Sequence, residues 1–206
     1  LHRRRHSFPT RRSSDLSTEN VLHGKWAVDE FTPQAGWSGP YFGSDFGFSQ
    51  DPSTLVRLWV HDSKLMIEHE AGGVGIETDE LPSLYDSVPG AGSHVIRADG
   101  ARPETISAMC RAKSAQSGKR FRVTAADKWP GSVEDGITHL RSYDKIVIHP
   151  RCRKVIAEAG KWSYKVDKLT GDALPVLAPG HDHYWDAIRY ALGPMIRAPK
   201  KSGIFV

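Results

Sequence analysis

The first half of the chain alternates hydrophobic and polar residues in the manner of β-strands. The runs 41–46, 53–61 and 64–70 are rich in the β-branched and aromatic residues that strands favour. The polar tripeptide 61–63 lies at the junction of the last two runs, which is typical of a hairpin. The pattern therefore predicts three antiparallel strands.

The second half of the chain alternates helical and strand patterns. Apolar residues at helical spacing predict a helix that starts at Ser132, with Ser132 as its cap and Asp135 three residues later. Similar patterns predict helices at 77–87, 103–113, 151–159 and 182–196 and strands at 94–98, 121–125, 145–149 and 162–166. Three antiparallel strands followed by this alternation predict an α/β fold with a mixed sheet flanked by helices.

Glycine and proline positions separate a central domain from less regular flanks. Residues 16–39 show little periodicity and are broken by Gly and Pro, so we expect a connector there. Residues 1–15 have neither periodicity nor a signal-peptide segment, and we interpret them as a disordered or non-native tail. The domain itself is expected over 40–196, with a loop at 168–180 and a loose tail at 197–206.

The charge of the chain is unevenly distributed. Its formal net charge is +4, from 28 basic and 24 acidic residues. Five of the basic residues and one acidic residue lie in the range 1–15, which leaves 23 of each in the rest of the chain. The bulk charge of the domain therefore gives no support for nucleic-acid binding, and only local clusters of cations can do so.

The sequence excludes several classes of protein. No apolar run approaches the length of a transmembrane helix. Cys110 and Cys152 lack the spacing of metal-binding cysteines, and we interpret them as reduced thiols of an intracellular protein. The chain contains no GxxxxGK[ST] string, because Gly118 and Lys119 lack both the upstream glycine and the following Ser or Thr.

Three Asp residues lie in settings that suit chemistry. Asp45 ends the first predicted strand, Asp99 follows the strand at 94–98, and Asp186 lies on the last helix. A single Asp at a strand end is more often a turn or capping residue. Three carboxylates from three separate elements are, however, what a magnesium-dependent phosphodiester chemistry needs.

The last helix begins in the string GHDHYWDAIRYAL. Asp182, His183 and Asp186 are expected on one face of its first turns, because Asp186 is three residues from His183 and four from Asp182. Asp182 is expected first as the N-cap of the helix, and His183 alone would be an ordinary surface histidine. Asp186 lies among apolar residues, so we expect it to be partly buried with a cation or a metal as its partner.

Three strings, in this order and at these separations, carry a resemblance to a known family. GSDFGFSQDPST, IRADGARPETI and DHYWDAIRYAL resemble the C-terminal nuclease domain of the large terminase subunits of tailed bacteriophages, which has an RNase H-like fold. VLHGKW resembles the end of that family's ATPase domain, and DKWPGSVEDGI resembles the segment after the fifth strand. The resemblance covers residues 20–196 and implies that 16–39 connects to an ATPase domain missing from this chain.

The resemblance also implies an activity and its residues. Asp45, Asp99 and Asp186 match the three acids of the family and His183 matches its histidine, so these four are the expected catalytic and metal-binding residues. Asp182 stands where Asn is common and is a possible further ligand. The expected cofactors are two Mg²⁺ or Mn²⁺ ions. The expected product is cut double-stranded DNA, made during genome packaging in the cytoplasm of the infected bacterial host.

The implied partners include macromolecules and no membrane. By resemblance they are double-stranded DNA, the terminase small subunit, the portal and the ATPase domain of the large subunit. The candidate DNA contacts flank the strand at 121–125 and are Lys119, Arg120, Arg122 and Lys128. Lys128 is the preferred single contact because it falls in DKWPGSVEDGI, whereas Arg189 on the last helix is expected to be a structural ion-pair partner. Such cations position the phosphate backbone without reading sequence.

Other interpretations remain open at this point. The absence of a phosphate-binding loop means that the chain is either a piece of the large subunit or a separately encoded nuclease. An RNase H-like resolvase or transposase could use a similar set of acids. A catalytically silent DNA-binding or motor-docking module could keep the fold, although three mutually repelling acids would then have no reason to persist together.

Overall fold

The computed structural model of the chain describes residues 19–47 and 49–197. The tail predicted at 1–15 and nearly all of the tail predicted at 197–206 lie outside these ranges. The strands are β1 (Trp26–Val28), β2 (Ser38–Asp45), β3 (Pro52–His61), β4 (Lys64–Val74), β5 (Val95–Ala98), β6 (Arg122–Ala125), β7 (Lys145–Ile148), β8 (Tyr164–Val166) and β9 (Ala173–Leu177). The helices are α1 (Leu81–Asp86), a short 3₁₀ helix η1 (Ala91–Ser93), α2 (Pro103–Arg111), α3 (Ser132–Ser142), α4 (Arg153–Ala159) and α5 (His183–Ile196).

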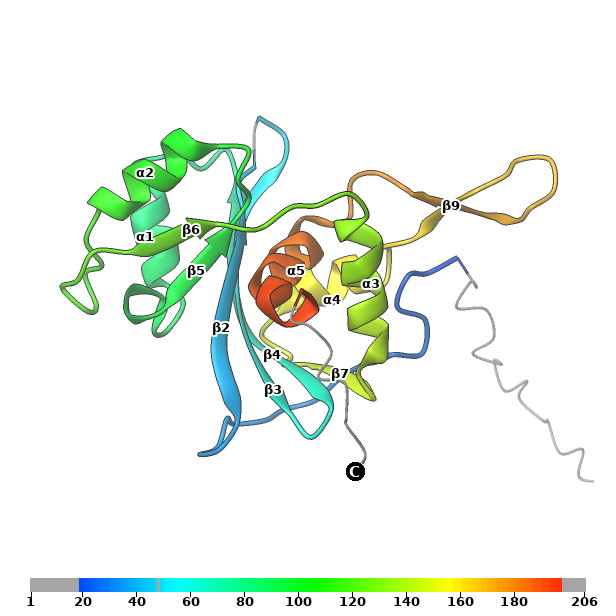
Figure 1. Cartoon of the computed structure of the whole chain (residues 1–206), viewed down its shortest axis with the longest axis horizontal. Helices are drawn as coiled ribbons and strands as arrows, with labels where there is room; N and C mark the ends of the chain where they lie inside the picture. The colour runs from blue at the N-terminus through cyan, green and yellow to red at the C-terminus, as the bar shows by residue number, and fades with distance from the viewer. Residues whose placement is uncertain (1–18, 48, 198–206) are drawn as a thin grey trace, which may run out of the picture.

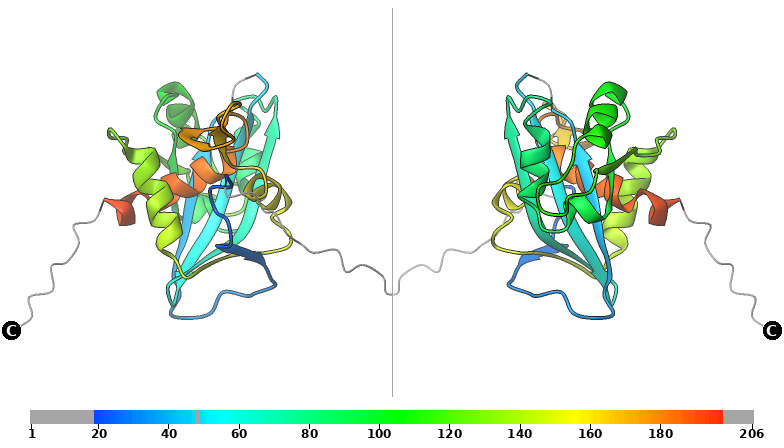
Figure 2. Two further views of the ribbon diagram at one scale, coloured as in Figure 1. Left: turned by 90° about the vertical axis from the view of Figure 1, so that its right-hand side faces the viewer. Right: turned by 90° about the vertical axis from the view of Figure 1, so that its left-hand side faces the viewer.

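Seven of the strands form one mixed sheet in the order β1-β7-β4-β3-β2-β5-β6. β2, β3 and β4 are antiparallel, as the hairpin pattern predicts, and the two views of Figure 2 show β3 and β4 side by side. β5 is parallel to β2, β6 is parallel to β5, and on the other side β7 is parallel to β4. The predicted mixed α/β fold is therefore confirmed.

Helices cover both faces of this sheet and give the domain two hydrophobic clusters. Figure 1 shows α3, α4 and α5 on one side and α1 and α2 on the other. Trp162 and Trp185 stack in the first cluster with ring centroids 5.6 Å apart, and both are fully buried. Phe42 of β2 and Tyr85 of α1 lie in the second cluster, between the sheet and the layer of α1 and α2. Alternate residues of β2 therefore point into different layers of the molecule.

Gly43 allows α5 to cross β2 at very short range. A Cβ atom at this position would lie 1.8 Å from the carbonyl oxygen of Ala187 and 2.8 Å from the backbone nitrogen of Ala191. No other residue fits there, because real side chains do not approach backbone this closely. The crossing places the first turns of α5 beside the carboxyl end of β2, where Asp45 lies.

The expectation of an irregular connector over 16–39 needs correction from Asn20 onward. Val21 and Leu22 are buried in the first hydrophobic cluster, and the N–H of Val21 bonds the carbonyl of Trp162 at 2.9 Å. β1 then pairs with β7 at the edge of the sheet. A three-residue strand is too short to leave a periodic pattern, so only its tertiary contacts reveal it.

Two further local expectations are also wrong. The stretch 168–180, expected to be a loop, contains β9, which pairs with β8 in a hairpin that projects from the body of the domain (Figure 1). Pro175 is tolerated in β9 because a two-stranded ribbon has free edges. Ser132 does not cap α3: Gly131 occupies the N-cap position with a φ of 83°, and no side chain caps this end.

Candidate active site

Asp45 and Asp99 are neighbours at the carboxyl ends of two parallel central strands. The register pairs Ser44 of β2 with Ala98 of β5, and the N–H of Asp99 bonds the carbonyl of Ser44 at 3.1 Å. Asp45 therefore lies level with Asp99 on the adjacent strand, about 4.8 Å away across the sheet. Since Phe42 and Ser44 point toward α1, Asp45 points to the other face, toward α5.

Asp186 comes to the same place on the first turns of α5. Burial raises the pKa of its carboxyl to about 6, opposed by Arg189, and the charges of Asp45 and Asp182 raise it further. Arg189 donates a hydrogen bond to Asp186, so the expected structural ion pair is confirmed. The buried hydroxyl of Tyr190 is close enough to all three acids that Asp186, Asp45 and Asp99 each raise its pKa, after burial itself.

His183 lies between two carboxylates. Its Nδ1 is 3.2 Å from Asp45 Oδ2, and its Nε2 is 3.4 Å from Asp51 Oδ1. The hydrogen bond to Asp45 raises the pKa of the imidazole to about 9, against the opposing effect of burial. His183 is therefore a cation at neutral pH in this structure. The sequence of the turn 50–53 does not predict the contact between Asp51 and His183, because that contact depends on where α5 begins.

Each of the three acids has a cationic side chain as its partner. Asp45 contacts His183, Asp186 contacts Arg189, and Lys128 Nζ lies 2.5 Å from Asp99 Oδ1. Within residues 19–47 and 49–197, no three Asp, Glu, His or Cys side chains are arranged as a formed metal site. The structure brings the predicted residues to one edge of the sheet, but with their charges balanced by side chains of the protein.

The N-terminus of α5 is held by Glu158, not by the expected cap Asp182. Asp182 occupies the N-cap position without a capping hydrogen bond from its side chain. The carboxylate of Glu158, on α4, instead accepts the N–H of Tyr184 at 2.9 Å. Burial raises the pKa of Glu158 to about 7. No local sequence signal identifies such a cap, because it comes from a different helix.

The predicted DNA contacts are divided between the two ends of β6. Lys128 follows the strand and lies at the carboxylates, over the ring of Tyr190. Lys119, Arg120 and Arg122 lie at its start, where the register pairs Arg122 with Val95 at the beginning of β5. This end is opposite to Asp99, roughly 13 Å away for four strand residues at 3.3 Å each.

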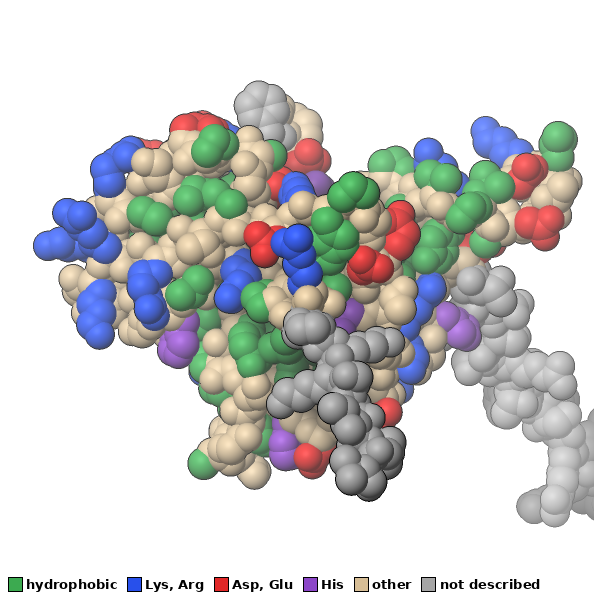
Figure 3. Space-filling model, in the orientation of Figure 1, with side chains coloured by type: hydrophobic (Ala, Val, Ile, Leu, Met, Phe, Trp, Pro, Cys, Tyr) green, Lys and Arg blue, Asp and Glu red, His purple; other side chains and the backbone are tan. Residues whose placement is uncertain are grey.

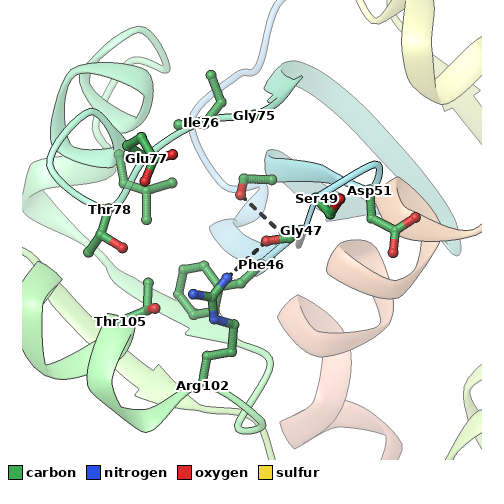
Figure 4. A pocket seen from close by; sticks show the side chains of 12 residues that line it. Phe46, Gly47, Ser49, Asp51, Gly75, Ile76, Glu77, Thr78, Arg102 and Thr105 are labelled. Carbon is green, nitrogen blue, oxygen red and sulfur yellow. Dashed lines mark hydrogen bonds between the residues drawn. The ribbon is translucent and has the colours of Figure 1, made fainter.

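A hollow of about 380 Å³ lies beside the β2–β3 loop. Figure 4 shows Arg102 and Thr105 on one wall, with Phe46 and Glu77 facing them. Arg102 donates to the carbonyl of Gly47 at 3.0 Å. The hollow has one arginine against two acids, Glu77 and Asp51, so its charge does not favour a phosphate. We therefore do not expect the DNA backbone to enter it.

These features define the class of the protein: a domain with the RNase H-like nuclease fold. Its structure is similar to the g2p large terminase nuclease domain of bacteriophage SPP1 solved with bound Mn, at a TM-score of 0.69 and 27% identity, covering 82% of this chain and 96% of that one. The P22 large terminase nuclease domain shares the fold at a TM-score of 0.57 and 15% identity, covering 87% of this chain and 90% of that one.

The chain belongs to the family described as terminase RNase H-like domain, whose sequence model matches residues 45–193. It is 31% identical over 169 residues to the PBSX phage terminase large subunit of Bacillus subtilis (strain 168), covering 77% of this chain. The chain spans 35% of the length of that relative. The resemblance drawn from the three strings is thereby confirmed, and the chain contains the nuclease domain of a terminase large subunit.

None of the helices in the described part of the chain has the length and apolar character needed to cross a bilayer.

Proposed function

We propose that this chain cuts double-stranded phage DNA by metal-dependent phosphodiester hydrolysis during genome packaging, with two Mg²⁺ or Mn²⁺ ions as cofactors. The observation that carries the proposal is that Asp45 and Asp99 lie at the adjacent carboxyl ends of β2 and β5, with Asp186 of α5 close enough to Asp45 for that charge to raise its pKa. Membership of the terminase family supports it. Two relatives, from phages SPP1 and G20c, were solved with bound Mn and Magnesium respectively.

The donor set fits hard divalent cations. Mg²⁺ and Mn²⁺ prefer carboxylate oxygens and keep open positions for water and phosphate. Asp51 and Asp182 add negative charge around the three acids, since both raise the pKa of His183. When bound, the ions would activate the attacking water and stabilise the charge that develops on the phosphate and the leaving oxygen.

The cationic partners of the acids would have different roles. Lys128 has a half-exposed side chain and can leave Asp99 for a DNA phosphate. Arg189 is only 7% exposed, so we expect it to stay on Asp186 and fix the orientation of that carboxylate. His183 must lose its proton before it can itself bind a cation, whereas its contact with Asp45 engages only Oδ2 of that carboxylate. Its role as a ligand remains a prediction.

The partners and setting of the activity follow from the family. We propose double-stranded DNA as the substrate, and the ATPase domain of the large subunit, the small subunit and the portal as partners. The host cytoplasm would be the place of action. Asp182 stays a candidate additional ligand, because it lies beside His183 and close enough to Asp186 to raise the pKa of that carboxyl.

Nicking of supercoiled plasmid DNA tests the proposal. The protein should convert the plasmid to nicked and linear forms with Mn²⁺ or Mg²⁺ and leave it intact in EDTA. The variant Asp45→Asn should be inactive under both conditions. Full cleavage by this variant, or cleavage by the wild type without metal, would overturn the assignment. DNA binding without cleavage under every metal condition would instead favour a silent docking module.

A further inference from the structure

Arg97 lies on the same face of the sheet as the acids. In β5, Ile96 and Ala98 are buried in the cluster under α1 and α2, so Arg97 points to the opposite face. Asp99 is two residues further along and shares that direction. The register places Arg97 level with Gly43 on one side and Thr124 on the other. Arg97 therefore lies next to the crossing of β2 and α5.

The guanidinium of Arg97 has no partner among the residues that the structure describes. Three other Arg side chains that are not fully exposed each pair with a carboxylate, Arg57 with Glu68, Arg102 with Glu104 and Arg189 with Asp186. Arg97 is also partly buried, yet neither a hydrogen bond nor an ion pair holds it within residues 19–47 and 49–197. No guanidinium nitrogen of Arg97 is both fully buried and unpaired, so the charged group reaches solvent and is open to a ligand.

The surface around Arg97 is open and cationic. Arg122 and Thr124 of β6 share this face and are exposed, while α2 packs on the other side of β6. Arg122, Arg97 and Lys128 form a row of cations on this face, and Lys128 is the member that reaches the carboxylates. In Figure 3, blue Lys and Arg side chains are spread over the part of the surface that β5 and β6 form. Arg122 donates to the carbonyl of Ser93 and Lys128 pairs with Asp99, so Arg97 is the uncommitted member of the row.

We propose that Arg97 binds a backbone phosphate of duplex DNA close to the one that is cut. The duplex would lie over the open face of β5 and β6, with α5 along its side. Arg97 and Asp99 are two strand residues apart, roughly 6.6 Å at 3.3 Å each. At an axial rise of about 3.4 Å per nucleotide, this separation corresponds to a phosphate one or two nucleotides from the cut.

The chemistry of the side chain matches this ligand. A guanidinium presents a planar pair of donors that binds phosphate oxygens bidentately, and its charge does not depend on pH in the working range. A contact to phosphate carries no sequence information, which suits an enzyme that must act along a long duplex. The inference rests on the proposed nuclease function, because it assigns the substrate contact of that same site.

Binding of a fluorescent duplex of about 20 base pairs, measured by anisotropy in EDTA at several salt concentrations, tests the inference. Arg97→Ala should weaken binding about 5- to 10-fold, and the slope of log K against log salt should fall by about 0.9. Arg111→Ala is the matched control: Arg111 is an exposed arginine on α2, on the other face of the sheet, and bonds only Ser107. Its binding and slope should equal those of the wild type.

The melting temperature provides a second readout. Because Arg97 has no partner in the fold, Arg97→Ala and Arg97→Gln should melt at or slightly above the wild-type temperature, while both lose affinity for DNA. Unchanged affinity and slope in both variants would overturn the inference, as would an equal loss in Arg111→Ala. A lower melting temperature in both variants would also overturn it, since Arg97 would then have a structural role.

Failure of this inference can be distinguished from failure of the nuclease proposal. The binding assay contains no metal and needs no cleavage, so it reports on Arg97 alone. If the wild type binds DNA through Arg97 but never nicks plasmid, the nuclease proposal fails and the phosphate contact stands. If the wild type nicks plasmid and Arg97→Ala binds equally well, the contact fails and the nuclease stands.

Discussion

Two clusters of ionisable side chains lie on this sheet, and they differ in their balance of charge. In the middle of β3 and β4, Glu68 accepts from Trp59 at 2.7 Å and pairs with Arg57 at 3.2 Å. Nearby, Arg151 donates to His149 and lies 2.9 Å from His69. Burial lowers the pKa of both histidines, so they are neutral acceptors at pH 7. Glu68 is therefore already paired with its own neighbours.

The cluster at the carboxyl ends of β2 and β5 has the opposite balance. It contains five acids, with Asp51 and Asp182 beside the three proposed ligands, against the cations His183, Lys128 and Arg189. The cluster therefore has a surplus of negative charge. Its three cation partners differ in how easily they can leave the carboxylates. Charge clusters of similar burial can therefore have different roles. A cluster whose carboxylate is already paired stabilises the fold, whereas carboxylates in excess over their cation partners call for a bound cation.

The largest expected effect comes from removing a proposed ligand. Asp99→Asn should lower the rate of Mn²⁺-dependent nicking by about 1,000-fold or more, because a bound metal contributes several kcal/mol to transition-state stabilisation. Initial nicking rates on supercoiled plasmid measure this directly. Glu68→Gln provides the matched control, since it removes a buried carboxylate from the satisfied cluster and should leave the rate per folded molecule within about 2-fold. Comparable losses in both variants would remove the distinction between the clusters.

The satisfied cluster should instead contribute to stability. Glu68→Ala leaves Arg57 and the indole N–H of Trp59 without their partner, and both side chains are partly buried. We expect a loss of roughly 3 kcal/mol in the free energy of unfolding. Urea denaturation in EDTA, followed by tryptophan fluorescence, measures it. A change below about 0.5 kcal/mol would mean that this cluster has no structural purpose.

Glu158 should affect the acidic cluster indirectly, through the N-terminus of α5. Glu158→Ala frees the first turn of α5, which carries His183 and Asp186, and should weaken Mn²⁺ binding about 10- to 100-fold, as the loss of supporting residues does in other metal sites. Glu158→Gln keeps an oxygen acceptor for the N–H of Tyr184 and should retain most of the affinity. Isothermal titration with Mn²⁺ measures both. Equal affinities in the two variants would contradict this role of the Tyr184 hydrogen bond.

The smallest expected effect is the pH dependence of the metal-free protein. The pKa of His183 is raised from 6.5 to about 9, so its ion pair stabilises fully below pH 6.5 and is lost as the pH rises through 9. The pKa of Asp186 is raised from 3.8 to about 6, so the folded state binds more protons and stability also falls between pH 4 and 6. Urea midpoints in EDTA should therefore decrease over both windows. In Asp45→Asn the decrease of the urea midpoint between pH 6.5 and 9 should be smaller than in the wild type. An undiminished decrease over this range would contradict the pairing of His183 with Asp45.

Sequence reasoning identified the residues that local patterns mark. Asp45 and Asp99 each end an apolar strand, and Asp186 is an acid within an apolar helix face, so their settings are visible without coordinates. The strand order that makes Asp45 and Asp99 neighbours is fixed by tertiary pairing and came only through family resemblance. Glu158 could not be found, since its partner is 26 residues away on another helix.

The DNA contacts illustrate a different limit. The sequence marks Lys119, Arg120 and Arg122 only as cations near a strand, and it does not show which end of that strand lies at the acids. Because β5 and β6 are parallel, residues before β6 lie away from Asp99, which follows β5. The sequence does not single out Arg97, because an arginine within a strand gives no sign of whether a partner faces it. That information exists only once β5 is placed between β2 and β6.

Direct titration of the metal-free protein with Mn²⁺, followed by the loss of the electron paramagnetic resonance signal of free Mn²⁺, tests the central claim most directly. We expect saturable binding of two ions per chain in the wild type. Asp45→Asn should lose at least one of these ions, and Glu68→Gln should bind as the wild type does. Binding in Asp45→Asn with wild-type stoichiometry and affinity, or none in the wild type, would contradict the assignment of the three acids as a metal site.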